Sequence, residues 1–534
     1  MVLSEFSPTR RELFSLIGKL AGAATMYQAM TSMGFAAESD FRQAINLQGA
    51  PAGKTVVILG AGLAGLTAAY ELRKAGYTVK VLEYQNRGGG RSITVRGGDR
   101  YTEISGDVIT CDFADGNYFN PGPWRLPHHH YAIIHYCREF GVALEPFIQE
   151  NHEAYLHSTK HFGGVPQRLG DVKNDMRGYT AQLLAKSLNQ HDLDQIVTTE
   201  DKEKLLDWLK TWGVLNANYQ YTASDTLAMQ RHPAVLPGGG LMPRWRSSQP
   251  LPMSELLDAR FWATMSMDYN YYSYKHSPPM FQPVGGMGKI GDAFTRECQE
   301  LITFNRKVIK IDQNANGVTV YHHNSQNPNA GVEQLHADYC ICTIPLSVLS
   351  QLDVQVSPAM KEAIAAIPYE TSAKVGLEFN RRFWEEDEWI YGGVTYTDMP
   401  INQISYPSDR LFSKGPAVLL GCYNFGADSY KFTALNPQQR IEAALAYGAR
   451  IHPQYSKEFR SGTSWAWHRV SWTLGCYGIW NNTTREKYYN TLCQIDNRIV
   501  LAGEHCSDLP AWQEGAILSG IDTAKRLHHK ILTT

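Results

Sequence analysis

A short apolar block that ends abruptly in glycine gives the clearest pattern in the chain. The run at 56–59 is apolar and mostly β-branched, a helix-like run follows at 66–72, and a second strand-like run follows at 77–82. An apolar run without polar interruptions predicts a strand that is buried on both faces, as in a parallel sheet. The order strand, helix, strand therefore predicts a parallel βαβ unit.

Further strand-like and helix-like runs lie far apart along the chain. The strand-like runs are at 307–311, 318–321, 338–345 and 498–504, and the helix-like runs are at 181–190, 200–212, 254–265 and from about Gln513 onward. Another helix is predicted after Gly288, because Ile290, Phe294 and Cys298 fall on one stripe. Residues 353–484 mix strands, turns and many tryptophans.

Three glycines lie between the first strand and the helix of the βαβ unit. Gly60, Gly62 and Gly65 have the spacing G-x-G-x-x-G, which permits a tight turn, close approach of the backbone to a pyrophosphate, and packing of the helix on the strand, respectively. The helix N-terminus offers free N–H groups to phosphates, and Glu83, at the end of the second strand, can accept ribose hydroxyls. We expect a dinucleotide site rather than a plain glycine-rich turn, and the acid disfavours NADP.

The residues that follow Glu83 narrow the choice of cofactor. The segment 83–91 reads Glu-Tyr-Gln-Asn-Arg-Gly-Gly-Gly-Arg and resembles the E-x-x-x-R-x-G-G-R continuation of the flavin amine oxidase superfamily, which binds FAD. The resemblance implies that Gly89 and Gly90 bring the backbone near phosphate and that Arg91 adds a charge-assisted contact. The alternative is that the arginines of this segment are solvated on a loop.

The same resemblance implies five further cofactor positions. Met287 falls in a turn that passes close to the flavin, and Val308 matches the position whose backbone meets the adenine. Glu504 ends a strand and would contact the sugar chain, while Gly515 and Ala516 open a last helix whose N-terminus would be aimed at the flavin ring.

One cysteine bears on how the flavin is attached. Cys476 falls where monoamine oxidases attach their flavin through a thioether. Because L-amino acid oxidases generally lack that link, we expect non-covalent FAD, with a covalent link at Cys476 as the alternative.

Within the superfamily, the L-amino acid oxidases are the best match. The stretch 122–127 reads Gly-Pro-Trp-Arg-Leu-Pro and resembles their G-P-x-R-L-P stretch, in which the arginine grips the substrate α-carboxylate. A guanidinium suits this task because its planar fork binds a carboxylate bidentately, so Arg125 is predicted to bind substrate rather than to be a structural surface residue. Trp124 departs from the usual smaller apolar residue and would reshape the rim of the pocket.

Four more residues acquire roles from this resemblance. Tyr406 matches the tyrosine whose hydroxyl joins the arginine, and Lys374 matches the lysine that holds a water beside flavin N5. A lysine flanked by small and apolar residues in a strand is itself unusual enough to suggest function. Trp467 and Trp512 match aromatic positions around the flavin and the substrate. The alternatives are a core tyrosine, an ion-paired structural lysine and tryptophans that only pack.

The fold class implied is α/β, or α+β overall, with a Rossmann-type FAD-binding domain of the glutathione-reductase and amine-oxidase kind. The fold is also expected to include an inserted substrate-binding domain with a mixed sheet, and a helical domain. The expected ranges are an N-terminal extension at 1–52, an FAD-binding domain at 53–95, 281–352 and 485–534, a substrate-binding domain at 96–140 and 353–484, and a mainly helical domain at 141–280.

Composition excludes several classes of function. The chain has 534 residues and a formal net charge of −2, which gives no electrostatic case for nucleic acid or an anionic membrane. No stretch approaches the roughly 20 apolar residues of a membrane helix. The nine cysteines are scattered without metal-ligand spacing, so we expect thiols and no metal site. The three histidines at 128–130 are expected on the surface.

The N-terminal segment allows two interpretations. Residues 9–24 contain two arginines before a modestly apolar run and resemble a twin-arginine export signal. The run contains Lys19 and has no clear cleavage site before about Ala36, so the alternative is an amphipathic helix that packs on the body. We leave the compartment open, with the cytoplasm slightly favoured over export, and we expect a homo-oligomer.

The function implied is FAD-dependent oxidation of L-amino acids by hydride transfer from Cα to flavin N5. The products would be a 2-oxo acid, ammonia and, from molecular oxygen, hydrogen peroxide. The alternatives are an amino acid 2-monooxygenase, which yields an amide and carbon dioxide, an amine or polyamine oxidase, and a flavin-binding scaffold without turnover. The sequence marks no catalytic base and does not indicate the preferred side chain.

Overall fold

A computed structural model describes most of the chain. The described residues are 39, 41–190, 198–222, 231–236, 238–241, 246–261 and 279–534. The export-like segment 9–24 and the tyrosine-rich stretch 269–274 lie outside them, as do residues 262–265 of the helix expected at 254–265. Among the described residues, no helix is long and apolar enough to cross a membrane.

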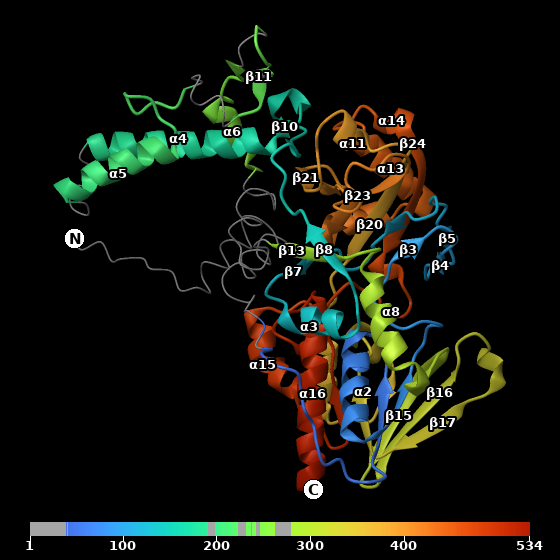
Figure 1. Cartoon of the computed structure of the whole chain (residues 1–534). Coiled ribbons are helices and arrows are strands. Elements are labelled where there is room, and N and C mark those ends of the chain that lie inside the picture. The colour runs from blue at the N-terminus through green and yellow to red at the C-terminus, as the bar shows by residue number, and fades with distance from the viewer. Residues whose placement is uncertain are drawn as a thin grey trace, which may run out of the picture.

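A six-stranded sheet forms the base of the molecule (Figure 1), and its strands come from separated segments of the chain. Its order is β14 (Ile302–Thr303), β2 (Thr78–Leu82), β1 (Thr55–Leu59), β18 (Tyr339–Cys342), β26 (Ile499–Leu501) and β25 (Ile495–Asp496). All neighbours pair in parallel except β25, which is antiparallel to β26. The βαβ unit predicted from the apolar runs is thereby confirmed.

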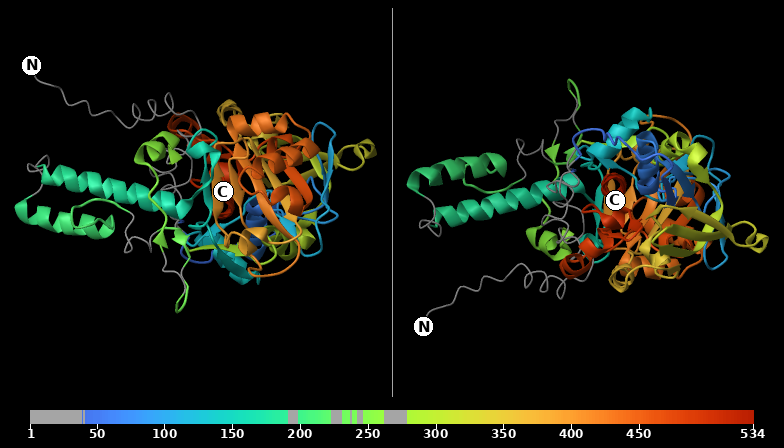
Figure 2. Two further views of the ribbon diagram at one scale, coloured as in Figure 1. Left: turned by 90° about the horizontal axis from the view of Figure 1, so that it is seen from above. Right: turned by 90° about the horizontal axis from the view of Figure 1, so that it is seen from below.

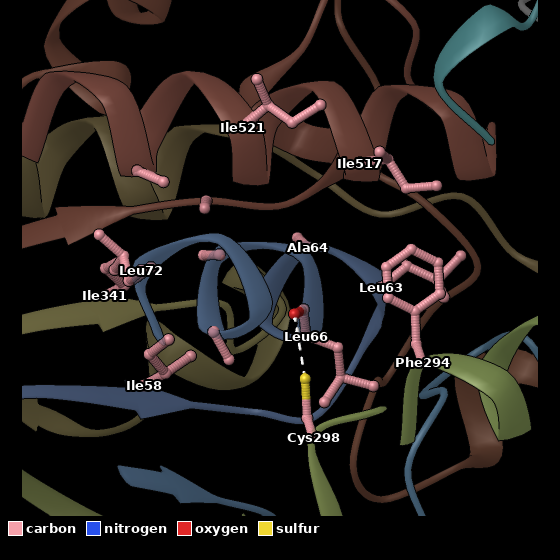
Figure 3. Packing of buried hydrophobic residues seen from close by; sticks show 14 of the residues in the cluster. Ile58, Leu63, Ala64, Leu66, Leu72, Phe294, Cys298, Ile341, Ile517 and Ile521 are labelled. Atoms are coloured by element: carbon pink, nitrogen blue, oxygen red, sulfur yellow. Dashed lines mark hydrogen bonds between the residues drawn. The ribbon is translucent and has the colours of Figure 1, made fainter. Parts of the chain in front are cut away.

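One face of this sheet is covered by helices. They are α2 (Leu63–Ala75), α8 (Gly288–Glu297), α16 (Gln513–Thr533) and α3 (Tyr131–Glu139). Figure 3 shows Ile517 and Ile521 of α16 packed over α2, with Phe294 of α8 beside Leu63. Burial of such side chains contributes roughly 1.5–3 kcal/mol each. The helix predicted from about Gln513 begins at that residue.

The other face of the sheet is covered by a second layer. A four-stranded sheet has the order β17 (Glu333–Ala337), β16 (Gly317–Asn324), β15 (Arg306–Asn314) and β19 (Asp353–Val354). The helices α10 (Pro358–Ala366) and α15 (Asn482–Cys493) pack against each other in the same core.

A seven-stranded sheet forms the upper part of the molecule in Figure 1. Its order is β10 (Gln167–Arg168), β9 (Tyr155–His157), β21 (Val394–Thr397), β22 (Gln403–Ser405), β23 (Ala417–Phe425), β20 (Ser372–Phe379) and β24 (Phe459–Ala466). Every residue of β20 is buried, because strands flank it on both sides and helices such as α12 (Gly426–Thr433) and α13 (Pro437–Gly448) pack beside it.

The segment 141–280, expected to be mainly helical, contributes strands as well. Strands β9 and β10 join the seven-stranded sheet, and β8 (Leu144–Phe147) pairs with β13 (Met280–Pro283), which also pairs with β7 (Leu126–Pro127). Helices α4 (Leu169–Asn189) and α5 (Thr199–Trp212) form a hairpin that projects away from the body (Figures 1 and 2).

The remaining elements are short. They are β3 (Val95–Arg96) with β6 (Tyr118–Phe119), β4 (Arg100–Thr102) with β5 (Val108–Thr110), β11 (Pro233–Val235) with β12 (Arg246–Ser247), α6 (Met253–Ala259), α9 (Leu346–Leu349), α11 (Phe383–Glu386), α14 (Tyr455–Glu458), and the 3₁₀ turns η1 (Phe162–Gly164), η5 (Gln299–Leu301), η6 (Pro328–Ala330), η7 (Trp467–Arg469) and η8 (Glu504–Cys506).

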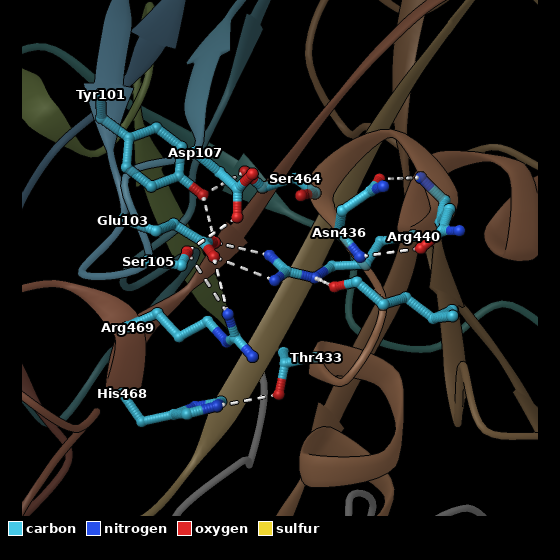
Figure 4. Close-up of polar contacts among 12 residues, drawn as sticks. Tyr101, Glu103, Ser105, Asp107, Thr433, Asn436, Arg440, Ser464, His468 and Arg469 are labelled. Atoms are coloured by element: carbon cyan, nitrogen blue, oxygen red, sulfur yellow. Dashed lines mark hydrogen bonds and ion pairs between the residues drawn. The ribbon is translucent and has the colours of Figure 1, made fainter.

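A fully buried ion pair fastens the β4–β5 hairpin to the seven-stranded sheet (Figure 4). Arg440 of α13 donates from Nη1 and Nη2 to the two oxygens of Glu103 at 2.5 and 3.0 Å, and both side chains are 0% exposed. The hydroxyl of Tyr101 donates to the carbonyl of Ser464 at 2.6 Å and lies 3.3 Å from Glu103 Oε1. The bidentate geometry satisfies both charges, which is the condition for burying such a pair.

Candidate functional site

A cavity of about 300 Å³ runs from the six-stranded sheet toward the seven-stranded sheet. It begins at the carboxyl ends of parallel strands, where Gly60, Glu83, Thr343 and Gly503 follow β1, β2, β18 and β26. This edge is where open α/β sheets bind their ligands. The other end is lined by Ser372 and aromatic residues of the upper sheet.

The three glycines of the βα turn meet different steric demands. Gly60 has φ of +102°, and a Cβ there would lie 2.6 Å from the Thr343 hydroxyl. A Cβ on Gly65 would lie 2.1 Å from the carbonyl oxygen of Gly60, so this glycine lets α2 pack against the turn. Gly62 lines the cavity and has no atom within 4 Å of its Cβ position, which leaves its backbone open to a ligand.

Glu83 presents a buried carboxylate at the end of β2. Its Oε2 accepts the N–H of Ala61 at 2.6 Å, and its Oε1 accepts the N–H of Gln85 at 2.8 Å. Burial raises the pKa of Glu83, while these two N–H donors oppose the rise. The carboxylate is thus fixed at the rim of the cavity, where it can accept hydroxyl groups.

Arg91 and Glu504, each predicted to contact the cofactor, are also paired with each other. Arg91 Nη1 donates to Glu504 Oε1 at 3.0 Å and to the carbonyl of Cys476 at 2.5 Å. Glu504 also accepts the N–H groups of Gly478 and Ala511, both at 3.2 Å. The pair therefore joins three distant segments in the cavity wall, a role that the sequence did not indicate.

The other predicted cofactor residues divide into two groups. Gly89, Gly90, Val308 and Ala516 line the cavity. Met287 and Gly515 are buried beside it: Met287 donates its N–H to Asn120 Oδ1 at 3.0 Å, and a Cβ on Gly515 would lie 2.1 Å from the carbonyl oxygen of Leu509.

Two helix N-termini face the cavity. Helix α2 begins after Gly62 and α16 begins after Trp512, and neither has a side-chain cap. The only acid in the first turn of α16 is Glu514, which instead accepts the N–H groups of Ala132 and Ile133 at 2.9 and 2.8 Å and so caps α3. The positive ends of α2 and α16 are therefore free to bind negative charge in a ligand.

Lys374 is a buried amine next to the cavity, 1% exposed, on β20. Its Nζ donates to the carbonyl of Gly122 at 2.5 Å and lies 4.2 Å from the ring centroid of Tyr423, and both of these residues line the cavity. Burial is the main cause that lowers the pKa of Lys374 to about 7; Cys476 opposes the lowering and the nearby charge of Arg125 adds to it. Lys374 itself is not among the lining residues.

Arg125 lies beside the same end of the cavity, two residues after the lining residue Pro123. Its guanidinium carbon is 4.8 Å from the ring centroid of Trp124, and Lys374 Nζ is 5.0 Å from a ring centroid of the same indole. Burial raises the pKa of Tyr396, and the positive charge of Arg125 opposes that rise. Trp124 therefore lies within reach of both Arg125 and Lys374, and Tyr396 is a tyrosine near Arg125.

Tyr406 is placed elsewhere, which corrects the expectation that it joins Arg125. Its side chain is 0% exposed, and its hydroxyl lies 2.7 Å from Thr395 Oγ1 and 2.7 Å from His452 Nε2. His452 in turn contacts Glu388 at 2.9 Å. Successive strand residues point to opposite faces, and Tyr406, which follows β22, points into the core.

Aromatic side chains line the inner end of the cavity, including two that the sequence analysis missed. Trp467, which donates its indole N–H to the carbonyl of Pro121 at 2.8 Å, and Trp512 both line it. Tyr423 and Tyr477 line it too. Tyr477 could have been predicted, because it directly follows Cys476, which the resemblance had already placed next to the flavin. Cys476 also lines the cavity, and burial raises the pKa of its thiol to about 12.

The histidines at 128–130 are not the surface residues that we expected. His129 and His130 are each 1% exposed, and the His130 ring centroid lies 4.8 Å from that of Trp512. They directly precede α3, a helix that packs against α16. Within the described part of the chain, no group of three or more His, Cys, Asp or Glu residues could hold a metal ion.

The cavity fits a flavin dinucleotide on several counts. Glycines without a Cβ leave room for phosphate, two helix N-termini supply N–H donors, a buried carboxylate faces the sugar position, and aromatic residues close the far end. Arg125 and Lys374 lie at this aromatic end, which is the end at the seven-stranded sheet.

Known proteins resemble this chain over most of its length. A bacterial protein, "Putative L-amino-acid oxidase YobN" of Bacillus subtilis (strain 168), is 28% identical over 503 residues, covering 88% of this chain and 94% of that protein. The L-amino-acid oxidase of Gloydius blomhoffii is 30% identical, covering 88% of each chain.

Solved structures share the fold at lower identity. A putrescine oxidase bound to putrescine has a TM-score of 0.56 at 18% identity and covers 91% of this chain and all of that chain. The cyclohexylamine oxidase of Brevibacterium oxydans has a TM-score of 0.58 at 15% identity and covers 90% and 99%. The sequence model described as flavin containing amine oxidoreductase matches residues 63–528. This chain therefore belongs to the flavin-containing amine oxidoreductase family, with the amine oxidase fold.

Proposed function

We propose that the chain is an FAD-dependent L-amino acid oxidase, which converts L-amino acids to 2-oxo acids, ammonia and hydrogen peroxide. The observation that carries the proposal is the guanidinium of Arg125, held against Trp124 beside the aromatic end of the cavity. A guanidinium there suits the α-carboxylate of an amino acid, a group that simple amines lack. The names of the relatives from Bacillus subtilis and Gloydius blomhoffii support the same activity.

The residues that would hold FAD follow the cavity from the βα turn to α16. Gly62, Gly89 and Gly90 would lie against the pyrophosphate with the N-terminus of α2, and Glu83 would accept ribose hydroxyls. When bound, the flavin supplies the two-electron acceptor that no amino acid side chain provides. Non-covalent binding is part of the proposal, because the thiol of Cys476 is neutral over the ordinary pH range.

The side chains at the inner end would bind and orient the substrate. Arg125 would take the α-carboxylate, with Tyr396 beside it. Arg125 and Lys374 together repel a cation, so the α-amine would be bound in its neutral form. The rings of Trp467, Trp512 and Tyr477 would exclude water and fix the Cα–H bond toward the cofactor.

A panel of the twenty amino acids in a peroxide assay tests the proposal directly. Stoichiometric peroxide and ammonia would support it, and an amide with carbon dioxide would identify a 2-monooxygenase instead. The amine oxidase alternative is favoured by the solved structures that share the fold, so putrescine and cyclohexylamine belong in the panel. Turnover of these amines without turnover of any amino acid would overturn the proposal.

We expect acid precipitation to release the flavin. The thiol of Cys476, which is neutral because its pKa is raised to about 12, is a poor nucleophile, so a thioether is not expected. A yellow supernatant and a colourless pellet would agree with this, and the absorbance of the supernatant should give one FAD per chain. A yellow pellet would show a covalent link, and loss of that link in Cys476→Ser would locate it.

Lys374→Met should slow the reaction of the reduced flavin with oxygen at least about tenfold, a change of about 1.4 kcal/mol. The reason is loss of a positive charge where negative charge develops on oxygen. Because the pKa of Lys374 is lowered to about 7, the cation is present below that pH and lost above it. The oxygen reaction of the parent should therefore slow as pH rises through about 7.

Stopped-flow spectroscopy of the two half-reactions measures this effect. Lys374→Met should react with oxygen at a rate that hardly changes across that pH range, and Lys414→Met, at an exposed site, should behave like the parent. A normal oxygen step with slowed anaerobic reduction would show instead that Lys374 orders the substrate.

A further inference from the structure

Two cysteines outside the cofactor cavity form a paired thiol site. Cys493 is the last residue of α15 and is partly exposed, and Cys506 ends η8 and is 7% exposed. All nine cysteines of the chain are thiols. Helix α15 packs against η8, and both side chains belong to the core between α15 and the sheet, where Cys506 is the largest single influence on the pKa of Cys493.

The surroundings of Cys493 lower the pKa of its thiol, even though burial acts in the opposite direction. The hydrogen bond from Cys506 lowers the pKa of Cys493, and the charge of Arg526 and a hydrogen bond from Tyr489 act in the same direction. Burial raises the pKa of every other cysteine in the chain. Cys493 therefore differs from the other eight in combining partial exposure, donors to its sulfur and a second thiol in contact.

We propose that Cys493 and Cys506 are a peroxide-reactive dithiol that closes to a disulfide when the chain meets hydrogen peroxide. Cys493 would be the attacking sulfur and Cys506 the resolving one. The source of the oxidant rests on the proposed function, because hydrogen peroxide is the product that an L-amino acid oxidase releases at this same molecule.

The chemistry balances without any further reactant. The Cys493 thiolate attacks one oxygen of the peroxide, the O–O bond breaks, and hydroxide leaves and takes up a proton to become water. The resulting Cys493 sulfenic acid is attacked by the sulfur of Cys506, an S–S bond forms, and a second water leaves with the Cys506 proton. Two thiols are oxidised by two electrons and one peroxide is reduced to two waters.

The site adjoins the cavity wall. Cys506 follows two residues after Glu504, the carboxylate that joins Arg91, Gly478 and Ala511. Both lie in the one 3₁₀ turn η8. The disulfide would therefore form at the turn that carries a central contact of the cofactor cavity.

The experiment uses the purified holoprotein, treated with hydrogen peroxide in the absence of substrate. We expect loss of two titratable thiols per chain and a cross-linked pair of peptides containing residues 493 and 506, both reversed by dithiothreitol. Cys493→Ser should form no such cross-link and should keep its Cys506 thiol. Cys298→Ser is the matched control, because Cys298 is buried and donates to the carbonyl of Leu66, and it should cross-link like the parent.

A second variant separates the two roles. Cys506→Ser removes the resolving sulfur, so Cys493 should accumulate as a sulfenic acid that dimedone labels. Absence of the cross-link in the parent, a cross-link between other cysteines, or equal dimedone labelling at Cys493 and at the other cysteines would each overturn the proposal.

A second experiment, in which the enzyme generates its own peroxide, tests this inference separately from the proposed function. With L-amino acids and air, the cross-link should form without added peroxide and should be suppressed by catalase. If added peroxide forms the cross-link and turnover does not, the dithiol stands and the oxidase activity is refuted. If turnover yields free peroxide and no cross-link forms under either condition, the dithiol is refuted and the oxidase stands.

Discussion

Replacing Arg125 with alanine is expected to lower the efficiency of flavin reduction by L-amino acids about 10²- to 10³-fold, since removing one partner of a buried charged pair costs about 3–5 kcal/mol. The guanidinium is held against Trp124 beside the cavity, so it would meet the substrate carboxylate away from bulk water. Without it, a bound carboxylate would have lost its water shell and gained no bidentate partner. Anaerobic stopped-flow reduction of the flavin measures the effect.

Three controls make the Arg125 result specific. Arg125→Lys should recover only part of the loss, because an ammonium is a point charge and cannot reproduce the planar fork. The FAD content of Arg125→Ala should equal that of the parent, and activity on the matching amines, which lack the carboxylate, should hardly change. If Arg125→Ala oxidises amino acids as well as the parent does, the carboxylate is bound elsewhere and the amine oxidase alternative gains the support.

Glu103→Ala is expected to destabilise the fold by about 3–5 kcal/mol, the cost of leaving one charge of a buried pair without its partner. Arg440 and Glu103 are both 0% exposed and are joined by two hydrogen bonds. In the variant, Arg440 would keep only its bond to the carbonyl of Leu435. Unfolding in urea, followed by tryptophan fluorescence, should begin at a clearly lower concentration.

An exposed ion pair provides the matched control for Glu103. Glu200 and Lys204 pair on the surface of α5 with side chains 81% and 66% exposed, and such pairs contribute only about 0.3–0.5 kcal/mol. Glu200→Ala should therefore unfold close to the parent. An unchanged urea profile for Glu103→Ala would show that water or another cation compensates Arg440, and the pair would then not fasten the β4–β5 hairpin.

The parts of the fold that could be predicted are those whose signal is local. The strand at 56–59 is apolar because both its faces are covered by helices and by the second sheet layer, and that coverage leaves a mark in the sequence itself. The helix at Gln513 likewise carries its own apolar stripe. The sequence predicted the α4–α5 hairpin only as two helical runs. The hydrophobic pattern of a helix does not show in which direction that helix projects from the body.

The site residues show the same limit. Gly60 and Gly65 are needed by contacts within one βα turn, so their spacing is informative. The choice between Tyr406 and Tyr396 depends on which face of the seven-stranded sheet meets Arg125, and that is set by strands from distant segments, such as the pairing of Tyr396 with Leu156. The bond between Arg91 and Glu504 joins residues that are 413 positions apart, which no local pattern encodes.

The Arg91–Glu504 contact also bears on when the molecule can acquire its cofactor during biosynthesis. Strand β1 is made early. Strand β26, which lies two places from β1 in the sheet, and the cavity-facing helix α16 are made more than four hundred residues later. A nascent chain that has emerged only through the seven-stranded sheet would carry the glycine turn without Glu504 and the wall of α16. The cavity wall is therefore complete only after residues 504–516 have been made, and before β26 is made the sheet that contains β1 is incomplete beyond β18, a state in which exposed strand edges favour misassociation.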